Sequence, residues 1–190
     1  MSASFLLQYL RHPRRTGAIA PSSRSLARAL VGGMDLERAR LVVEYGPGTG
    51  AVTREIVERL APGARFIAVE ASPVFCARLQ QTFPELLVER ATVSSIPRLL
   101  AERGLGPVDA IVSGIPWTLM KNEERERDIE ATVRVLRRGG RFSTFLYKHG
   151  LVLPAAADLV ERLGSSFSTV ERERTVWNNF PPAEVLRCVR

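Results

Sequence analysis

The sequence has little of the chemistry that metal centres, disulfide scaffolds and membrane spans require. Its 190 residues include two cysteines and two histidines, and neither Cys76 nor Cys188 lies in a cluster with metal-ligand spacing. No apolar stretch is long enough to cross a bilayer, and no secretion signal is visible. We therefore expect a cytoplasmic protein with buried, reduced cysteines and no metal ion.

Acidic residues are missing from residues 1–34, although this segment carries five arginines. The whole chain has a formal net charge of +7, which permits an anionic partner, either nucleic acid or an acidic membrane surface. Residues 3–11 have apolar side chains at i, i+1, i+4 and i+5, which predicts a short amphipathic helix. We predict an N-terminal amphipathic segment at 1–34 and a cofactor-binding domain at 35–190.

From residue 35 onward, apolar runs typical of strands alternate with helical patterns. Strands are predicted at 41–45, 65–70, 86–89, 108–113, 141–147, 167–176 and 183–189. Helices are predicted at about 50–61, 73–82, 95–103, 123–137 and 154–163, with Gly139-Gly140 as a helix stop. This order predicts a Rossmann-like α/β fold: a mainly parallel seven-stranded sheet, helices on both faces, and an antiparallel strand at the C-terminal edge.

The most informative motif is a glycine-rich turn, Glu44-Tyr45-Gly46-Pro47-Gly48-Thr49-Gly50. It joins a predicted strand to a predicted helix, which is the context of a nucleotide-cofactor loop. Dinucleotide enzymes use G-x-G-x-x-G, whereas the spacing here is G-x-G-x-G and a carboxylate, Glu44, precedes it. That carboxylate would repel a pyrophosphate, but it suits the ammonium and sulfonium groups of S-adenosylmethionine.

A second acid, Glu70, ends the next apolar run, twenty residues after Gly50. In this position a carboxylate can accept hydrogen bonds from a ribose diol. The predicted cofactor is S-adenosyl-L-methionine, with S-adenosyl-L-homocysteine as the product. The residues predicted to bind it are Glu44, Tyr45, Gly46, Gly48, Thr49, Gly50, Glu70, Ala71, Ala91, Thr92 and Ser113.

The segment from Ser113 to Trp117 follows the fourth strand, at the sheet edge where ligands bind in open α/β folds. Amino-methylating enzymes often have Asn-x-Pro-aromatic here, and the Asn holds a planar amine. Gly114 replaces that Asn, which argues against a nucleobase and for an aliphatic amine. The predicted catalytic residues are Ser113, Gly114, Trp117 and Tyr147.

The two aromatic members of this set are predicted to offer their π faces to an ammonium. Tyr147 ends the fifth strand on the same rim, and a packing role fits it equally well. The aromatic turn at 177–182 is either another wall of the cleft or a hairpin anchor. The charged run at 121–128 is interpreted as the solvated start of a helix.

These segments together resemble the bacterial phospholipid N-methyltransferases, relatives of the ribosomal-RNA adenine dimethylases. The resemblance rests on four segments: the Phe5-Leu6 helix leading to residues 17–23, the glycine turn with Glu70, residues 113–116, and residues 179–183. It implies a class I fold and methyl transfer from S-adenosylmethionine to the amine of phosphatidylethanolamine, towards phosphatidylcholine.

The resemblance also implies that the N-terminal helix lies on the inner face of the membrane as a peripheral anchor. This agrees with the basic, acid-free start, because such helices favour anionic lipid surfaces. The predicted partners are an anionic membrane surface and an amine-bearing phospholipid, with a monomeric protein. The residues predicted to contact the membrane are Phe5, Leu6, Tyr9, Leu10, Arg11, Arg14 and Arg15.

Two departures from this family pattern leave alternatives open. Arg90 stands where many relatives carry an acid, so the adenine amine is left to Thr92 or a main-chain group. Trp117 replaces a smaller aliphatic residue, so another lipid amine, such as an ornithine lipid, is a second acceptor. An RNA adenine methyltransferase and a non-enzymatic lipid-binding module are the competing interpretations.

Overall fold

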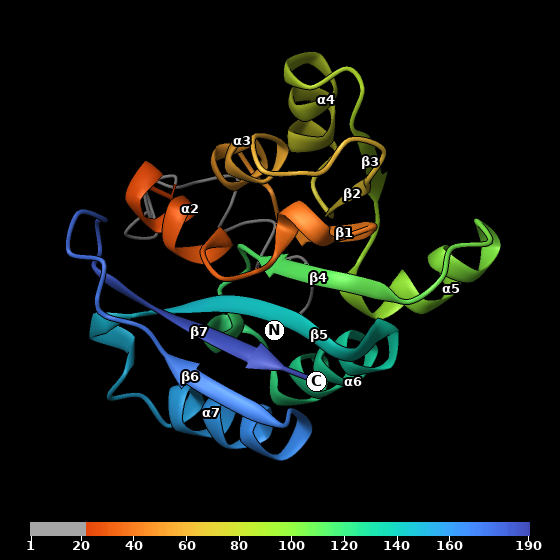
Figure 1. Cartoon of the computed structure of the whole chain (residues 1–190). Coiled ribbons are helices and arrows are strands. Elements are labelled where there is room, and N and C mark those ends of the chain that lie inside the picture. The colour runs from red at the N-terminus through yellow and green to blue at the C-terminus, as the bar shows by residue number, and fades with distance from the viewer. Residues whose placement is uncertain (1–21) are drawn as a thin grey trace.

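The computed structural model describes residues 22–190 and shows a three-layered α/β arrangement (Figure 1). One sheet of seven strands forms the middle layer, in the order β3-β2-β1-β4-β5-β7-β6. The strands are β1 (Leu41–Tyr45), β2 (Arg65–Glu70), β3 (Leu87–Arg90), β4 (Val108–Ser113), β5 (Leu136–Tyr147), β6 (Thr169–Arg172) and β7 (Ala183–Val189).

Helices cover both faces of this sheet. The α-helices are α2 (Arg24–Val31), α3 (Ala51–Val57), α4 (Pro73–Thr82), α5 (Ile96–Glu102), α6 (Asn122–Val135) and α7 (Pro154–Ser166). Short 3-10 helices are η1 (Leu36–Arg38), η2 (Val93–Ser95), η3 (Trp117–Leu119) and η4 (Lys148–Gly150).

Strand directions agree with the predicted fold class. β3, β2, β1, β4 and β5 pair in parallel, and β7 pairs antiparallel with both β5 and β6. The antiparallel strand is therefore one place in from the edge, which β6 forms. A Rossmann-like fold with a closing β6–β7 hairpin is confirmed.

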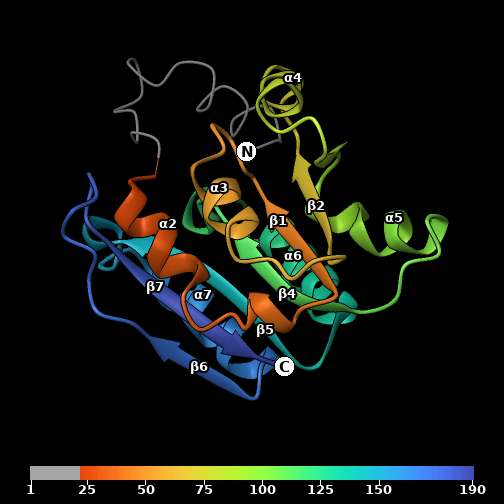
Figure 2. The same ribbon diagram turned by 45° about the horizontal axis from the view of Figure 1, so that its top comes forward.

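The buried side of each helix meets one of two apolar clusters. Val42 faces the cluster that α2 and α3 complete, whereas Val43 and Tyr45 face the cluster that α5, α6 and α7 complete. Figure 2 shows these helix layers on opposite sides of the sheet. All five residues of β1 are buried because both faces are covered, as expected for a central parallel strand.

Helix α2 belongs to the packed fold, although its sequence lies in the predicted N-terminal segment. The Ser23 hydroxyl accepts a hydrogen bond from the Leu26 amide and thereby caps the helix. Leu26 and Leu30 are fully buried against the sheet. The predicted helix at 3–11 and the predicted membrane-contacting residues lie outside the described residues.

The junction of α6 and β5 differs from the prediction. Helix α6 ends at Val135, and Gly139-Gly140 belongs to the strand rather than stopping the helix. A Cβ on Gly140 would lie 2.8 Å from the Arg137 carbonyl oxygen and 3.1 Å from that of Asp109. The glycine is needed because backbones approach closely where the β4–β5 register shifts.

Within residues 22–190, no helix is both long enough and apolar enough to span a membrane.

Candidate active site

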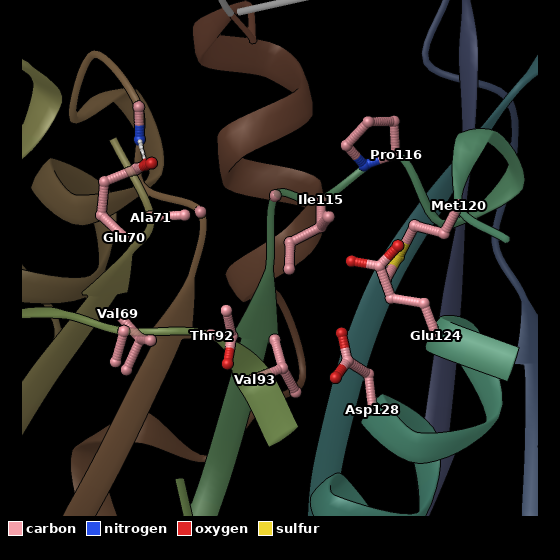
Figure 3. Close-up of a pocket in the computed structure, with 14 residues that line it drawn as sticks. Val69, Glu70, Ala71, Thr92, Val93, Ile115, Pro116, Met120, Glu124 and Asp128 are labelled. Carbon is pink, nitrogen blue, oxygen red and sulfur yellow. Dashed lines mark hydrogen bonds between the residues drawn. The ribbon is translucent and has the colours of Figure 1, made fainter. Parts of the chain in front are cut away.

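A cleft opens at the carboxyl ends of β1, β2, β3 and β4, where the strand order reverses between β1 and β4. Its empty volume, including the part open to solvent, is about 710 Å³, and it lies at the edge of the sheet where ligands bind in open α/β folds. Figure 3 shows side chains from the loops after β2, β3 and β4 and from α6 converging on it. The lining residues are Gly46, Gly48, Val69, Glu70, Ala71, Ala91, Thr92, Val93, Gly114, Ile115, Pro116, Met120, Glu124 and Asp128.

The glycine turn forms the floor of the cleft between β1 and α3. Gly46, Gly48 and Gly50 all have positive φ angles, of 64°, 54° and 83°. A Cβ on Gly46 would lie 3.1 Å from Ile115 Cγ1, whereas one on Gly48 would meet no atom closer than 4.0 Å. Gly48 is therefore required by its backbone conformation and keeps the surface open to a ligand.

Glu44, directly before this turn, is buried with only half of its carboxylate satisfied. It is fully buried, and Thr53 Oγ1 donates a hydrogen bond of 2.7 Å to its Oε2. Its Oε1 has no hydrogen-bond partner among the described residues. Burial, with a smaller contribution from the charge of Glu70, raises the pKa of Glu44 to about 8 against the opposing Thr53 hydrogen bond. A cationic ligand group would provide the missing partner.

Glu70 ends β2 and is held in place by main-chain donors. The Gly48 and Ser72 amides donate to its two carboxylate oxygens at 3.2 and 2.8 Å. Figure 3 shows the Gly48 contact and the side chain beside Ala71. Burial raises the pKa of Glu70 even though these amides oppose the shift. The carboxylate has lone pairs left for a ligand diol, as its sequence position predicts.

The loop after β3 faces the cleft through the three residues that follow Arg90. Arg90 ends β3 with an exposed side chain and does not line the cleft. Ala91, Thr92 and Val93 line it instead. Thr92 is therefore the polar side chain that this loop presents to the cleft, and its contact with the adenine amine stays a prediction.

Helix α6 contributes two acids that sequence reasoning assigned to solvent. Glu124 and Asp128, one turn apart, both line the cleft. Asp128 is 5% exposed, and burial followed by the charge of Glu124 raises its pKa to about 7. The signal was present in the sequence, because Asp128 shares a helical face with Ile129 and Thr132, which are also buried.

The loop after β4 divides into residues that face the cleft and residues that support it. Gly114, Ile115 and Pro116 line the cleft. Ser113 is fully buried and its hydroxyl accepts a 2.9 Å hydrogen bond from the Trp117 indole N–H. Trp117 is 1% exposed and packs edge-on against Phe142 in the core. The prediction that Trp117 presents its ring to the amine is wrong, because the ring points into the core.

Five other predicted site residues do not line the cleft, and one of them is the fully buried Glu44. Tyr45 is buried on the α6 side of the sheet, with its hydroxyl 3.3 Å from Thr132 Oγ1. Gly50 begins α3, where a Cβ would lie 2.9 Å from Phe83. Tyr147 ends β5 and stacks on His149. Thr49 lies within the turn, partly buried.

The aromatic turn before β7 does not form a wall of this cleft. Trp177 is 70% exposed and Phe180 is 80% exposed. The turn is anchored from beneath, because Asn179 Oδ1 accepts a hydrogen bond from the Ser23 amide at 2.9 Å. The Pro182 carbonyl oxygen also accepts one from the Lys148 amide at 2.7 Å.

Comparison with known proteins agrees with this geometry. Residues 42–140 match the methyltransferase domain family, and the chain belongs to that family. It is 34% identical over 143 residues to an ornithine lipid N-methyltransferase of Singulisphaera acidiphila, covering 73% of this chain and 74% of that protein.

Two further similarities concern a shorter segment and the fold. A stretch of 60 residues is 45% identical to ribosomal RNA small subunit methyltransferase A of Burkholderia mallei, covering 31% of this chain and 22% of that protein. The fold is that of an O-methyltransferase from Bacillus cereus in complex with SAH, with a TM-score of 0.66 and 14% identity over all of this chain and 92% of that one.

The protein is therefore a methyltransferase that uses S-adenosylmethionine. The residues present fit this cofactor. Glu44 Oε1 is a buried acceptor in need of a cationic partner, the glycine turn leaves room for backbone approach, and Glu70 is placed for a ribose. Among residues 22–190, no cluster of three or more potential metal ligands was found.

Proposed function

We propose that the protein transfers a methyl group to the amine of a lipid head group, and that an ornithine lipid is the acceptor it uses best. The observation that carries this proposal is the 34% identity to an ornithine lipid N-methyltransferase over most of both chains. Phosphatidylethanolamine is the second acceptor, because it presents the same kind of primary aliphatic amine.

The cleft supports an in-line displacement on such an amine. The cofactor supplies an electrophilic methyl group: the amine nitrogen forms the new C–N bond while the C–S bond breaks and its electron pair stays on sulfur. Gly114 lines the cleft, and because a Cβ there would lie 2.8 Å from the Gly46 carbonyl oxygen, the glycine lets this loop pack closely against the glycine turn. Ile115 and Met120 exclude water, and positioning and desolvation then favour reaction.

The amine must lose a proton before it attacks. A primary ammonium has a pKa of about 10.4 when solvated, and burial beside a sulfonium lowers it. Tyr147 and His149, which stack on each other at the end of β5, are the side chains that we propose as relays for this proton. Neither residue lines the cleft. Replacing Tyr147 by Phe and His149 by Gln therefore tests whether either one transfers the proton, and unchanged rates in both variants would exclude this role.

Exposed apolar side chains on the same rim support a lipid acceptor. Val152 and Leu153, after η4, are 87% and 45% exposed, and Trp177 and Phe180 belong to the neighbouring turn. The Lys148–Pro182 main-chain hydrogen bond joins the two loops. Trp and other apolar residues exposed together in this way are typical of surfaces that enter the lipid interface.

The acceptor is tested with S-adenosylmethionine labelled in its methyl group. Purified protein is incubated with vesicles containing ornithine lipid, vesicles containing phosphatidylethanolamine, or total RNA. We expect label in the organic phase, with a faster initial rate on ornithine lipid. Label found in RNA alone would overturn the proposal and would give weight to the 60-residue similarity to the ribosomal RNA methyltransferase.

The exposed apolar rim is tested with the double variant Trp177→Ser/Phe180→Ser. The matched control is Val74→Ser on α4, because Val74 is an apolar residue that is likewise exposed, at 66%. We expect the double variant to bind anionic vesicles several-fold more weakly in co-sedimentation, while the control binds like the wild type. Binding of S-adenosylhomocysteine should be unchanged in both. Equal vesicle binding by all three proteins would remove this support for a lipid acceptor.

A further inference from the structure

The acids at the two ends of the cofactor cleft come from different elements, since strands β1 and β2 carry those at one end and helix α6 carries those at the other. Glu44 and Glu70, at the ends of β1 and β2, would hold the amino-acid and ribose parts of the cofactor. The adenine base of the cofactor would then lie further along the cleft, towards residues 91–93 and helix α6. Figure 3 shows this end, with Thr92 and Val93 on one side and Glu124 and Asp128 on the other.

The loop after β3 offers no carboxylate to the base. Arg90 lies outside the cleft, and Val93 and Ile115 contribute only apolar surface from their side chains. The one polar side chain there is Thr92, whose hydroxyl is already 3.2 Å from the Ser94 hydroxyl. An adenine brings an exocyclic amine, a donor that costs free energy if it is buried without an acceptor.

Asp128 stands where such an acceptor is needed. Its carboxyl interacts with the main chain and hydroxyl of Ser94, in η2, which places it beside the loop after β3. It is 5% exposed and lines the cleft together with Thr92. A carboxylate has about four acceptor positions, so Ser94 does not exhaust its capacity.

We propose that Asp128 accepts a hydrogen bond from the exocyclic amine of the cofactor's adenine and thereby selects adenine over a purine with an oxygen at C6. In this protein the acid that contacts the adenine would therefore come from helix α6, whereas many relatives have an acid at the position of Arg90. Glu124, one turn earlier and less deeply buried, adds negative charge to the same end of the cleft.

This role makes base recognition depend on pH. Burial and the neighbouring Glu124 raise the pKa of Asp128 to about 7, while Ser94 and Arg127 oppose the shift. Tyr45, which faces Asp128 from β1, stays neutral because burial also raises its pKa. The carboxylate accepts the amine better than the protonated acid does, so affinity for adenine should increase as pH rises through about 7.

The test compares two ligands by calorimetry: S-adenosylhomocysteine and S-inosylhomocysteine, in which oxygen replaces the amine. Wild-type protein should prefer the adenine ligand by roughly tenfold or more at pH 8. Asp128→Asn should bind the adenine ligand more weakly and the inosine ligand more tightly, because the Asn amide can donate to the C6 oxygen. The affinity ratio of the two ligands should therefore collapse, and its change between pH 6 and pH 8 should disappear.

Thr92→Val is the matched control on the opposite wall, and thermal melting checks that each variant is folded. We expect Thr92→Val to keep the wild-type ratio within about twofold. An unchanged ratio in Asp128→Asn, or a ratio that collapses in Thr92→Val instead, would overturn the proposal. A purely structural role for Asp128 would weaken both ligands equally and would therefore overturn it as well.

Discussion

Two buried glutamates, eleven residues apart, show how the ligand-binding region differs from the region that only holds the fold. Glu55, on α3, is 1% exposed and is surrounded by Arg24, Arg28 and Arg59 at 3.1, 3.4 and 2.8 Å. Burial raises its pKa, but hydrogen bonds from Arg59 and Arg24 and the charges of Arg59 and Arg28 outweigh burial, so its net pKa is lowered.

Glu44 is equally buried, yet among residues 22–190 it has one hydroxyl donor and no cation in an ion pair with it, and its pKa is raised. The two carboxylates therefore differ in their charged neighbours, since three arginines contact Glu55 and the described hydrogen bond to Glu44 comes from a hydroxyl. The region between α2 and α3 supplies its own counter-charges, whereas the glycine turn leaves that task to the ligand. Burying a carboxylate without a cation costs stability, and such a cost at a binding site is consistent with a functional role.

The largest expected effect comes from Glu44→Gln. The variant keeps the size and the Thr53 contact but loses the charge that would pair with the cofactor. We expect affinity for S-adenosylmethionine to fall roughly 10- to 100-fold, the range for one charged hydrogen bond. Calorimetry measures it. An unchanged affinity would mean that Glu44 does not face the cofactor.

Glu55→Gln should lower the stability of the fold and leave cofactor affinity nearly unchanged. Its three arginines lose their shared acceptor, and unfolding free energy should fall by about 2 kcal/mol, less than for a fully buried pair because two of the arginines are exposed. Denaturant unfolding measures this loss. Cofactor affinity should stay within about twofold of the wild type; a large drop would show that the two regions are coupled.

The pH dependence of melting should separate the two acids. The raised pKa of Glu44 means that the ligand-free fold is penalised as pH rises from the ordinary range of a glutamate to about 8. The lowered pKa of Glu55 gives a contribution present above the ordinary range and lost as pH falls through the lowered value. Glu44→Gln should therefore flatten, by a few degrees, the fall in melting temperature between the ordinary range of a glutamate and about pH 8, and an equal slope in both proteins would contradict this.

The smallest effect is expected from Arg24→Ala. Its side chain is 67% exposed, and Glu55 keeps Arg28 and Arg59. A surface pair of this kind contributes about 0.2–1 kcal/mol, so denaturant unfolding should change little. A loss as large as that of Glu55→Gln would show that the cluster depends on Arg24.

The same contrast explains what could be predicted from the sequence. The positions of Gly48 and Glu70 in the cleft could be predicted from local spacing. One lies in a turn after a strand, and the other is an acid at the end of the next strand. The alternation of strands and helices likewise predicted the fold. The direction of the Trp117 ring was not predictable, because it depends on Ser113 and Phe142 meeting it in three dimensions.

Asp128 was missed for a related reason. An acidic stretch at the start of a helix is usually solvated, and only packing of α6 against η2 turns this one inward. The orientation of Arg90 could not be predicted either. Only the structure shows that its side chain is exposed at the end of β3 and that the next loop residues face the cleft.

The unpaired oxygen of Glu44 also makes cofactor binding a proton-exchange reaction. With a pKa of about 8, the ligand-free side chain is mostly protonated at pH 7. Pairing with a cation favours the carboxylate, so each binding event should release close to one proton to the buffer. Heats measured in phosphate and in Tris should then differ in proportion to the difference in ionisation enthalpy of the two buffers, and Glu44→Gln should remove the larger part of that difference, because Asp128, with a pKa of about 7, still contributes a smaller release.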